Sequence, residues 1–414
     1  MKSSPKRIVI FGINYAPELT GIAPYTTAVA EHYASEGHWV RVVTGVPHYP
    51  QWRGRAVPAG IGAGNPSVVR YRHFVPQQAN ALGRMAYEAT WFISASRSLA
   101  SQGVEVVIGI VPSLSGGLLA LLGSRRWGAP VGIVVQDLMG PAALQSGYRG
   151  GVTVAGLTSR VERLMLRRAD RVAIIAESFR PYLHRAHVSG SRIVRVRDWS
   201  RPSEPSESVL QCRRRLGWQD DEFVCLHAGN MGQKQGLDTV IDAALHLPSK
   251  GFRVVLAGDG NDRKRLRDRA ASLGAANVQF IDLQPAGRYE SMLRAADALI
   301  VNQRPSVGDM SFPSKLASYM AAGRPIIAAV ASESETALEV RAAQSGQVVP
   351  AGDPIALAEA VNALKNAPEE SGVFGRNGRD YASMRLTADA ALREYDDFLA
   401  QLTGGSRSLA RVSG

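Results

Sequence analysis

The sequence predicts an α/β protein built from two Rossmann-like domains, each with a doubly wound parallel sheet. The chain has 414 residues, which is more than one hydrophobic core usually organises. Its β-branched apolar runs, such as residues 104–111 and 131–135, are typical of strands buried on both faces of a parallel sheet. Segments with apolar residues at helical spacing separate most of these runs in both halves of the chain.

The expected strands define the domain boundaries. Seven lie in the first half, at residues 7–11, 39–44, 68–74, 104–111, 131–135, 171–176 and 193–196. Six lie in the second half, at residues 223–227, 253–257, 278–281, 298–301, 325–329 and 347–349. Prolines and serines break the periodicity at 198–208, as an interdomain linker does. We therefore expect domains at 1–197 and 209–379, a helix at 380–402 that packs back on the first domain, and a flexible tail at 403–414.

The net charge of +12 is concentrated in the first half of the chain. Residues 1–196 hold 22 Lys and Arg against 9 Asp and Glu, whereas the remainder holds 26 against 27. Such a balance attracts nucleic acid, anionic headgroups or a lipid-linked pyrophosphate. No recognised nucleic-acid motif accompanies it, and arginines beside Trp52 and Trp127 suit an anionic membrane surface. We expect membrane contact through the first domain and no nucleic-acid partner.

The cysteine content and the apolar runs bear on location. The two cysteines, Cys212 and Cys225, have no Cys or His partner at metal-ligand spacing, which fits a reducing compartment and argues against a disulfide framework. The apolar run at residues 8–11 is too short for a signal peptide, and none is long enough to span a bilayer. We expect a cytoplasmic protein that associates peripherally with the inner face of the plasma membrane.

Three loops are expected at the carboxyl ends of parallel strands, where open α/β sheets bind ligands. Residues 12–25 read GINYAPELTGIAPY, residues 227–238 read HAGNMGQKQGLD, and residues 312–327 read FPSKLASYMAAGRPII. Glycine in such a loop and the following helix N-terminus favour a phosphate group. The first loop lacks the Gly-x-Gly-x-x-Gly fingerprint, which weakens a dehydrogenase interpretation. Taken alone, the first loop is better explained as a plain strand-to-helix turn.

Together, these three segments resemble glycosyltransferase family 4, which has the GT-B fold of two Rossmann-like domains facing across a cleft. The first loop and VPHYPQW at 46–52 look closest to the colanic-acid-type branch, which builds bacterial surface polysaccharides. The resemblance extends from Arg7 to about Leu402. It implies a retaining, metal-independent hexosyltransferase that moves a sugar from a GDP- or UDP-sugar to a lipid-linked or glycan acceptor, with no further cofactor.

The same resemblance implies the roles of particular residues. Asp137, after the fifth strand, and Lys234 are the catalytic candidates. The expected donor contacts are Gly21, Gly229, Asn230, Lys234, Ser314, Lys315, Ser318 and Glu335. The expected acceptor contacts are Glu18, Thr20, His48 and Tyr49. No metal ligands are expected.

The sequence departs from the family pattern at three places. Asn230 stands where the family usually has Arg, so Lys234 becomes the first choice for the pyrophosphate and Lys315 the second. The family's two glutamates, spaced eight apart, fall on Met310 and Ser318, so ribose recognition must come from elsewhere, and the candidates are Ser318, Glu333 and Glu335. Gln136 stands where a His is common.

Purely structural roles for these residues, and other functions for the protein, remain open at this point. Lys234 is also compatible with a solvated loop lysine, Asp137 with a turn cap, and His48 with a structural histidine. A sugar-nucleotide 2-epimerase has the same architecture and needs no acceptor. A non-catalytic nucleotide-sugar-binding scaffold would tolerate the loss of the paired glutamates.

Overall fold

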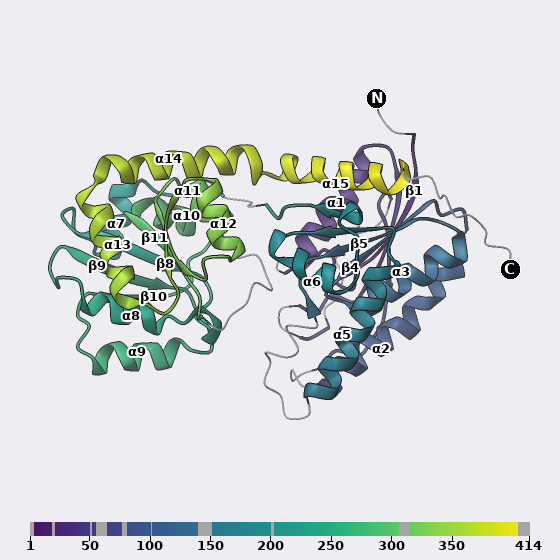
Figure 1. Cartoon of the computed structure of the whole chain (residues 1–414), viewed down its shortest axis with the longest axis horizontal. Helices are drawn as coiled ribbons and strands as arrows, with labels where there is room; N and C mark the ends of the chain where they lie inside the picture. Colours follow the sequence, from purple (N-terminus) through teal and green to yellow (C-terminus); the bar gives the residue numbers. More distant parts are fainter. Residues whose placement is uncertain are drawn as a thin grey trace. The chain divides into compact units, whose positions relative to one another are not determined.

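The computed structural model describes residues 4–18, 21–49, 52–54, 64–76, 81–100, 102–139, 151–199, 203–305 and 315–404. The chain divides into two compact units (Figure 1). Unit 1 comprises Met1–Arg197 with Leu392–Gly414, and unit 2 comprises Asp198–Ala391. Each unit contains one parallel sheet.

Unit 1 has a seven-stranded sheet in the order β3-β2-β1-β4-β5-β6-β7. Its strands are β1 (Arg7–Phe11), β2 (Trp39–Gly45), β3 (Ser67–Tyr71), β4 (Val106–Val111), β5 (Val131–Val135), β6 (Arg171–Ile174) and β7 (Ile193–Arg195). Its helices include α1 (Ala23–Ser35), α2 (Ala81–Ala95), α3 (Leu114–Trp127), α5 (Gly151–Arg168) and α6 (Arg180–Arg185), with short 3₁₀ turns η1 (Ser96–Ala100), η2 (Glu177–Phe179) and η3 (Gly190–Arg192). Helix α3 packs between α2 and α5, so these three helices form one layer (Figure 1).

Unit 2 has a six-stranded sheet in the order β10-β9-β8-β11-β12-β13. Its strands are β8 (Phe223–Ala228), β9 (Phe252–Ala257), β10 (Val278–Ile281), β11 (Ala298–Asn302), β12 (Ile326–Val330) and β13 (Gly346–Pro350). Its helices include α7 (Val209–Leu216), η4 (Gln233–Gln235), α8 (Asp238–Leu245), α9 (Arg263–Ser272), α10 (Arg288–Ala295), α11 (Lys315–Ala322), α12 (Glu335–Ala342), α13 (Pro354–Asn366) and α14 (Pro368–Arg385). The expected strands of both halves are therefore confirmed, with ends that move by a few residues.

The sheet of unit 2 is buried on both faces, as its apolar strands predict. Val224 and Leu226 of β8 join one apolar core with side chains of α10, α11 and α14. Cys225, between them, joins a second core with side chains of α8 and α13. Successive strand residues point to opposite faces, so a strand between two helix layers must be apolar at every position.

The strand order reverses once in each sheet. In unit 1, β1 pairs with both β2 and β4, and in unit 2, β8 pairs with both β9 and β11. At such a point the loops after the two neighbouring strands diverge to opposite faces of the sheet and leave room for a ligand. The loops that follow β1 and β8 are two of the three that the sequence singles out.

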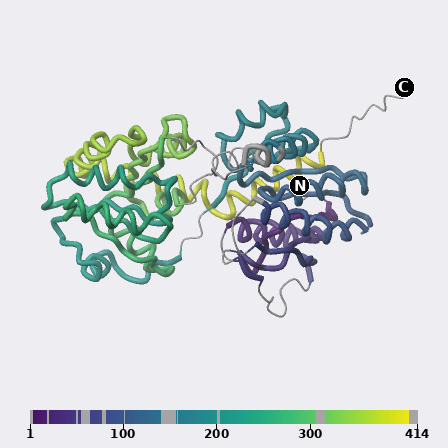
Figure 2. Tube along the Cα trace, turned by 90° about the horizontal axis from the view of Figure 1, so that it is seen from below, coloured from purple at the N-terminus to yellow at the C-terminus, as the bar shows by residue number. Residues whose placement is uncertain are grey.

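The carboxyl-terminal helix differs from the expectation. One helix was expected at residues 380–402, but α14 ends at Arg385 and α15 (Ala388–Gly404) begins after a break. The Thr387 hydroxyl accepts a hydrogen bond from the Ala390 N–H at 3.2 Å, which caps the new helix. Helix α14 packs on α11 of unit 2, whereas α15 from Leu392 onward belongs to unit 1 (Figure 2).

Helix α15 is held on unit 1 by specific contacts. Tyr33 of α1 donates its hydroxyl hydrogen to the carbonyl oxygen of Tyr395 at 2.7 Å, and His32 pairs with Asp396 at 2.8 Å. A Cβ atom on Gly132 of β5 would lie 2.4 Å from the Phe398 ring. Glycine at position 132 therefore lets the helix approach the sheet closely.

The segment expected to be a free linker is partly docked. The Ser206 N–H donates to the Gly287 carbonyl at 3.2 Å, and the Glu207 N–H donates to Ser291 Oγ at 3.2 Å. Both acceptors lie at the start of α10, so residues 203–208 pack on unit 2. Within the described residues, no helix has the length and apolar character needed to cross a membrane.

Candidate functional site

The loops after β8 and β9 meet through backbone contacts at the switch point of unit 2. The Gly229 N–H donates to the Ala257 carbonyl at 2.8 Å, and the Met231 N–H donates to the Asp259 carbonyl at 2.8 Å. Gly258 has φ +129°, and a Cβ there would lie 2.1 Å from the Gly229 carbonyl oxygen. Glycine at 258 is therefore required, because any side chain would force the two loops apart.

The end of β11 holds the loop that carries Lys234. Asn302, the last residue of β11, is buried and donates from Nδ2 to the carbonyls of Gln235 at 2.6 Å and Gly236 at 2.9 Å. The Arg304 N–H donates to the Lys234 carbonyl at 3.0 Å. The Lys234 side chain is exposed. An exposed cation is thus carried by a loop whose backbone is held by hydrogen bonds.

Helix α11 places a second cation beside the end of β8. Its first residue, Lys315, has Nζ 3.2 Å from Nε2 of His227. Tyr319, one turn later, is fully buried, and its hydroxyl accepts from the Ala228 N–H at 2.7 Å and donates to the Ala228 carbonyl at 3.1 Å. These bonds fix the helix N-terminus against the strand end. Burial lowers the pKa of Lys315 to about 8.

The other expected donor contacts lie around this point. Asn230 is exposed, with Nδ2 3.4 Å from Oε1 of Gln235. Ser318 is partly buried on α11, and Ser314 lies outside the described residues. Glu335 was expected in a loop, but it occupies the first turn of α12 with a side chain only 1 % exposed. It presents almost no surface to a ligand in this structure.

In unit 1, Glu18 is a buried brace between two loops. Its Oε1 accepts from the N–H groups of His48 at 2.7 Å and Tyr49 at 2.8 Å, and its Oε2 accepts from Asn14 Nδ2 at 2.9 Å. Glu18 is 3 % exposed. It therefore joins the loop after β1 to the loop after β2, and its expected contact with an acceptor stays a prediction.

His48 is also buried, within an aromatic cluster. Its Nδ1 donates to the Val46 carbonyl at 2.8 Å, and its Nε2 accepts from the Tyr87 hydroxyl at 3.0 Å. The rings of His73 and Trp52 lie 5.2 Å and 5.6 Å from the His48 ring. Burial lowers the pKa of His73 to about 4, so His73 is neutral near pH 7. His48 is thus a satisfied structural histidine.

The remaining expected residues of unit 1 stay nearer the surface. Tyr49 is partly exposed, and Gly21 is exposed with φ +67° and a Cβ position 3.0 Å from the Tyr49 ring. Thr20 lies outside the described residues. Asp137 follows β5 and is partly exposed. Gly21, Tyr49 and Asp137 are thus at least partly exposed at this edge.

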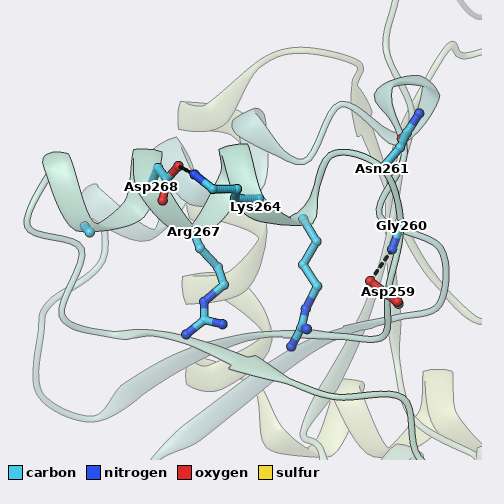
Figure 3. A pocket seen from close by; sticks show the side chains of 8 residues that line it. Asp259, Gly260, Asn261, Lys264, Arg267 and Asp268 are labelled. Atoms are coloured by element: carbon cyan, nitrogen blue, oxygen red, sulfur yellow. Dashed lines mark hydrogen bonds and ion pairs between the residues drawn. The ribbon is translucent and has the colours of Figure 1, made fainter.

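A shallow polar pocket of about 540 Å³ lies along α9 (Figure 3). Its lining includes Asp259, Asn261, Lys264, Arg267 and Asp268. Lys264 pairs with Asp268 at 2.7 Å, so part of its charge is neutralised internally. His227, Gly229 and Lys315 are not in its lining, but its residues 259–261 belong to the loop after β9 that contacts the loop after β8.

Comparison with known proteins identifies the family. A model of the glycosyl transferases group 1 matches residues 210–381, and a glycosyl transferase 4-like domain matches residues 20–199. The putative colanic acid biosynthesis glycosyl transferase WcaI of Escherichia coli K12 is 30 % identical over 412 residues, which cover 94 % of this chain and 98 % of that protein. The chain belongs to this glycosyltransferase family.

Solved structures place this glycosyltransferase in the GT-B fold class. Sucrose-phosphate synthase from Thermosynechococcus elongatus matches with a TM-score of 0.76 at 18 % identity, over 97 % of this chain and all of that one. Anabaena HepE in complex with UDP-glucose matches with a TM-score of 0.69 at 16 % identity, over 95 % of this chain and 99 % of that one. The family and the fold expected from the sequence are therefore confirmed.

Sequence reasoning missed three residues that organise the site of the glycosyltransferase. His227 and Tyr319 lie inside the singled-out loops, but their partners are 88 and 91 residues away along the chain. Asn302 lies at the end of an expected strand and holds the Lys234 loop. The only sequence signal for His227 and Asn302 is a polar residue at the carboxyl end of an apolar strand. Within the described residues, no cluster of three His, Cys, Asp or Glu suitable for a metal was found.

Replacing Tyr319 by Phe should destabilise the protein by about 1–3 kcal/mol, because the buried N–H and carbonyl of Ala228 would lose their partner. Denaturant unfolding of the variant measures this change. Tyr289→Phe is the matched control, because no hydrogen bond of the Tyr289 hydroxyl is known within the described residues. Equal unfolding midpoints for Tyr319→Phe and wild type would show that the hydrogen bonds between Tyr319 and Ala228 contribute nothing to stability.

Proposed function

We propose that this protein is a retaining, metal-independent hexosyltransferase that moves a sugar from a GDP- or UDP-sugar to a lipid-linked or glycan acceptor. The observation that carries the proposal is the pair of lysines at the β8–β11 switch point. Lys234 and Lys315 stand there beside glycine backbone, and within the described part of the chain neither makes an ion pair with a carboxylate. Such an arrangement fits a diphosphate.

The chemistry requires stabilisation of the departing nucleoside diphosphate. Negative charge grows on that group as the glycosidic bond breaks, so preorganised cations and N–H groups at its position lower the barrier. Lys234, on its fixed loop, can follow the phosphate, and Lys315 supplies a fixed charge. We assign Asp137 to the acceptor hydroxyl or to the positive charge that develops on the sugar, because it lies at the carboxyl edge of unit 1.

Two named relatives support particular parts of the proposal. The structural match to HepE with bound UDP-glucose supports a nucleotide-sugar donor, since the chain shares that fold. The match to the putative colanic acid transferase over nearly the whole chain supports a role in surface polysaccharide or glycolipid synthesis. We place the reaction on the cytoplasmic side of the plasma membrane, where nucleotide sugars are substrates.

The layer formed by α2, α3 and α5 supports contact with an anionic membrane. These helices contain two carboxylates, Glu88 and Glu162; Glu88 accepts from the Ser115 N–H in the first turn of α3, and Glu162 accepts from the Met139 N–H after β5. The arginines exposed on α3 and α5 are Arg125, Arg126, Arg160, Arg163, Arg167 and Arg168. An outer surface with arginine and no free carboxylate attracts anionic headgroups.

Exposed aliphatic side chains interrupt the same layer. Leu82, Met85 and Ile93 lie on one face of α2 at helical spacing, and Leu82 is 78 % exposed. Leu122 of α3 and Leu164 of α5 are exposed beside them. The two tryptophans expected at the membrane are instead packed, Trp127 on Phe11 and Trp52 against His48 and Tyr87. We therefore propose that the exposed aliphatic side chains of α2, and not the two tryptophans, contact the membrane interface.

A nucleoside diphosphate should raise the unfolding temperature without divalent metal. A ligand that binds only the folded state stabilises it by mass action, and lysines supply the charge that a metal would otherwise supply. Thermal unfolding with UDP or GDP, each in excess EDTA and in excess Mg²⁺ or Mn²⁺, measures this. Stabilisation that appears only with metal would contradict metal independence.

Lys234→Ala should lower the transfer rate roughly a hundredfold while the unfolding temperature stays unchanged. The lysine is exposed, so its removal affects the charge at the ligand and not the core. Lys250→Ala, an exposed lysine elsewhere in unit 2, is the control. Wild-type turnover in Lys234→Ala would remove this residue from the mechanism, and product formed without any acceptor would favour the epimerase alternative.

The α2–α3–α5 layer should bind vesicles that contain anionic lipid and not neutral ones. Each charge near such a surface contributes about 1 kcal/mol, so Arg125→Glu, Arg126→Glu and Arg163→Glu together should abolish co-sedimentation at low salt. The matched control reverses three exposed arginines of unit 2: Arg214, Arg267 and Arg376. Equal loss in both triple variants would mean that net charge, and not this face, governs binding.

A further inference from the structure

Lys315 is a partly buried cation that makes no ion pair with a carboxylate of the described residues. Its Nζ has one hydrogen-bond partner among the described residues, Nε2 of His227 at 3.2 Å. A lysine ammonium has three N–H donors, so two remain for a ligand. Removing a charge from water without an opposite charge is costly, and an anion that binds there would relieve this cost.

His227 is built to accept a hydrogen bond from this lysine. It is fully buried, and its Nδ1 lies 3.2 Å from the Ile300 carbonyl of β11. A carbonyl only accepts, so Nδ1 carries the hydrogen and Nε2 presents its lone pair to Lys315. Burial, and then the nearby charge of Lys315, keep the pKa of His227 well below its ordinary value. The imidazole therefore stays neutral and remains an acceptor.

Gly229 completes the arrangement. The Lys315 Nζ lies 3.2 Å from the position that a Cβ on Gly229 would occupy. The ammonium therefore lies beside the Gly229 backbone at the end of β8, where no side chain intervenes, and contacts His227. Tyr319, one turn after Lys315 on α11, holds the start of this helix at β8 through its two hydrogen bonds to Ala228.

We propose that His227 is a positioning residue that holds the Lys315 ammonium over Gly229, and that phosphate binding there is coupled to proton uptake by Lys315. The inference rests on the proposed nucleotide-sugar donor and adds a proton-linked step to it. With a pKa of about 8, Lys315 is about half protonated in the free protein at pH 8. A bound phosphate favours the charged form, so the lysine takes one proton from water as the anion binds.

The pH dependence follows from the groups around the lysine. Its pKa is lowered by burial, and among the described residues the one titratable group that contacts it is His227, which is neutral. Below pH 8 the free protein already carries the proton, and affinity should be nearly constant. Above pH 8 affinity should fall, by up to tenfold for each pH unit, because the proton must then be supplied on binding.

Calorimetric titration with UDP and with GDP tests the inference on the full chain. At pH 8, in two buffers of different ionisation enthalpy, the wild type should take up about half a proton per bound nucleotide. Lys315→Arg keeps a permanent charge and should take up none. Lys234→Ala should bind more weakly with unchanged proton uptake, and Lys250→Ala should match the wild type.

Two substitutions at His227 separate positioning from folding. His227→Gln retains an acceptor and should keep the pH at which affinity begins to fall, whereas His227→Leu should move it to lower pH, because the charged lysine loses its acceptor. If His227→Leu does not fold, the inference is still tested by the proton uptake of Lys315→Arg and by the pH at which the affinity of His227→Gln begins to fall. Binding without proton uptake, or equal uptake in Lys315→Arg, overturns the inference alone. Failure of both nucleotides to bind overturns the proposed donor as well.

Discussion

The close approach of bare backbone at the carboxyl ends of β8 and β9 is the constraint on which the rest of unit 2 depends. Gly229 and Gly258 touch, and hydrogen bonds from Gly229 and Met231 to the next loop hold that contact. Because the strand ends stay close, Tyr319 can reach Ala228 and bring the start of α11 to the switch point. Lys315 then lies beside Gly229, and a side chain at position 229 would displace its ammonium group.

The corresponding edge of unit 1 is organised by buried carboxylates. Glu18 accepts from backbone N–H groups after β2, Glu88 from the Ser115 N–H after β4, and Glu162 from the Met139 N–H after β5. Each therefore serves as a loop brace at the carboxyl ends of the strands. The carboxyl ends of the strands thus differ between the two units. In unit 1 they carry acids that accept hydrogen bonds from backbone, and in unit 2 they carry the lysines that we propose bind the ligand.

Much of the fold was predictable from sequence because its signals are local. Continuous apolar runs located the strands, and glycine-bearing loops after them located both switch points. The break between Arg385 and Ala388 was missed because apolar periodicity continues through it, and only the Thr387 cap marks it. The site was predicted less fully. Lys315 was named, but its partner His227 was not, because that pairing depends on how α11 docks on β8. Glu18 was named, but its hydrogen bonds to the loop after β2 were not predicted, since an acid in a loop looks the same in sequence whether it faces solvent or backbone.

The return of α15 to unit 1 has a consequence for how the chain folds during synthesis. Unit 2 is inserted between Arg197 and Leu392, so the helix that covers Gly132 of β5 is translated after the whole of unit 2. Domains generally fold as they emerge, amino-terminal first. We therefore expect unit 1 to emerge from the ribosome with this part of its sheet uncovered until α15 has been translated.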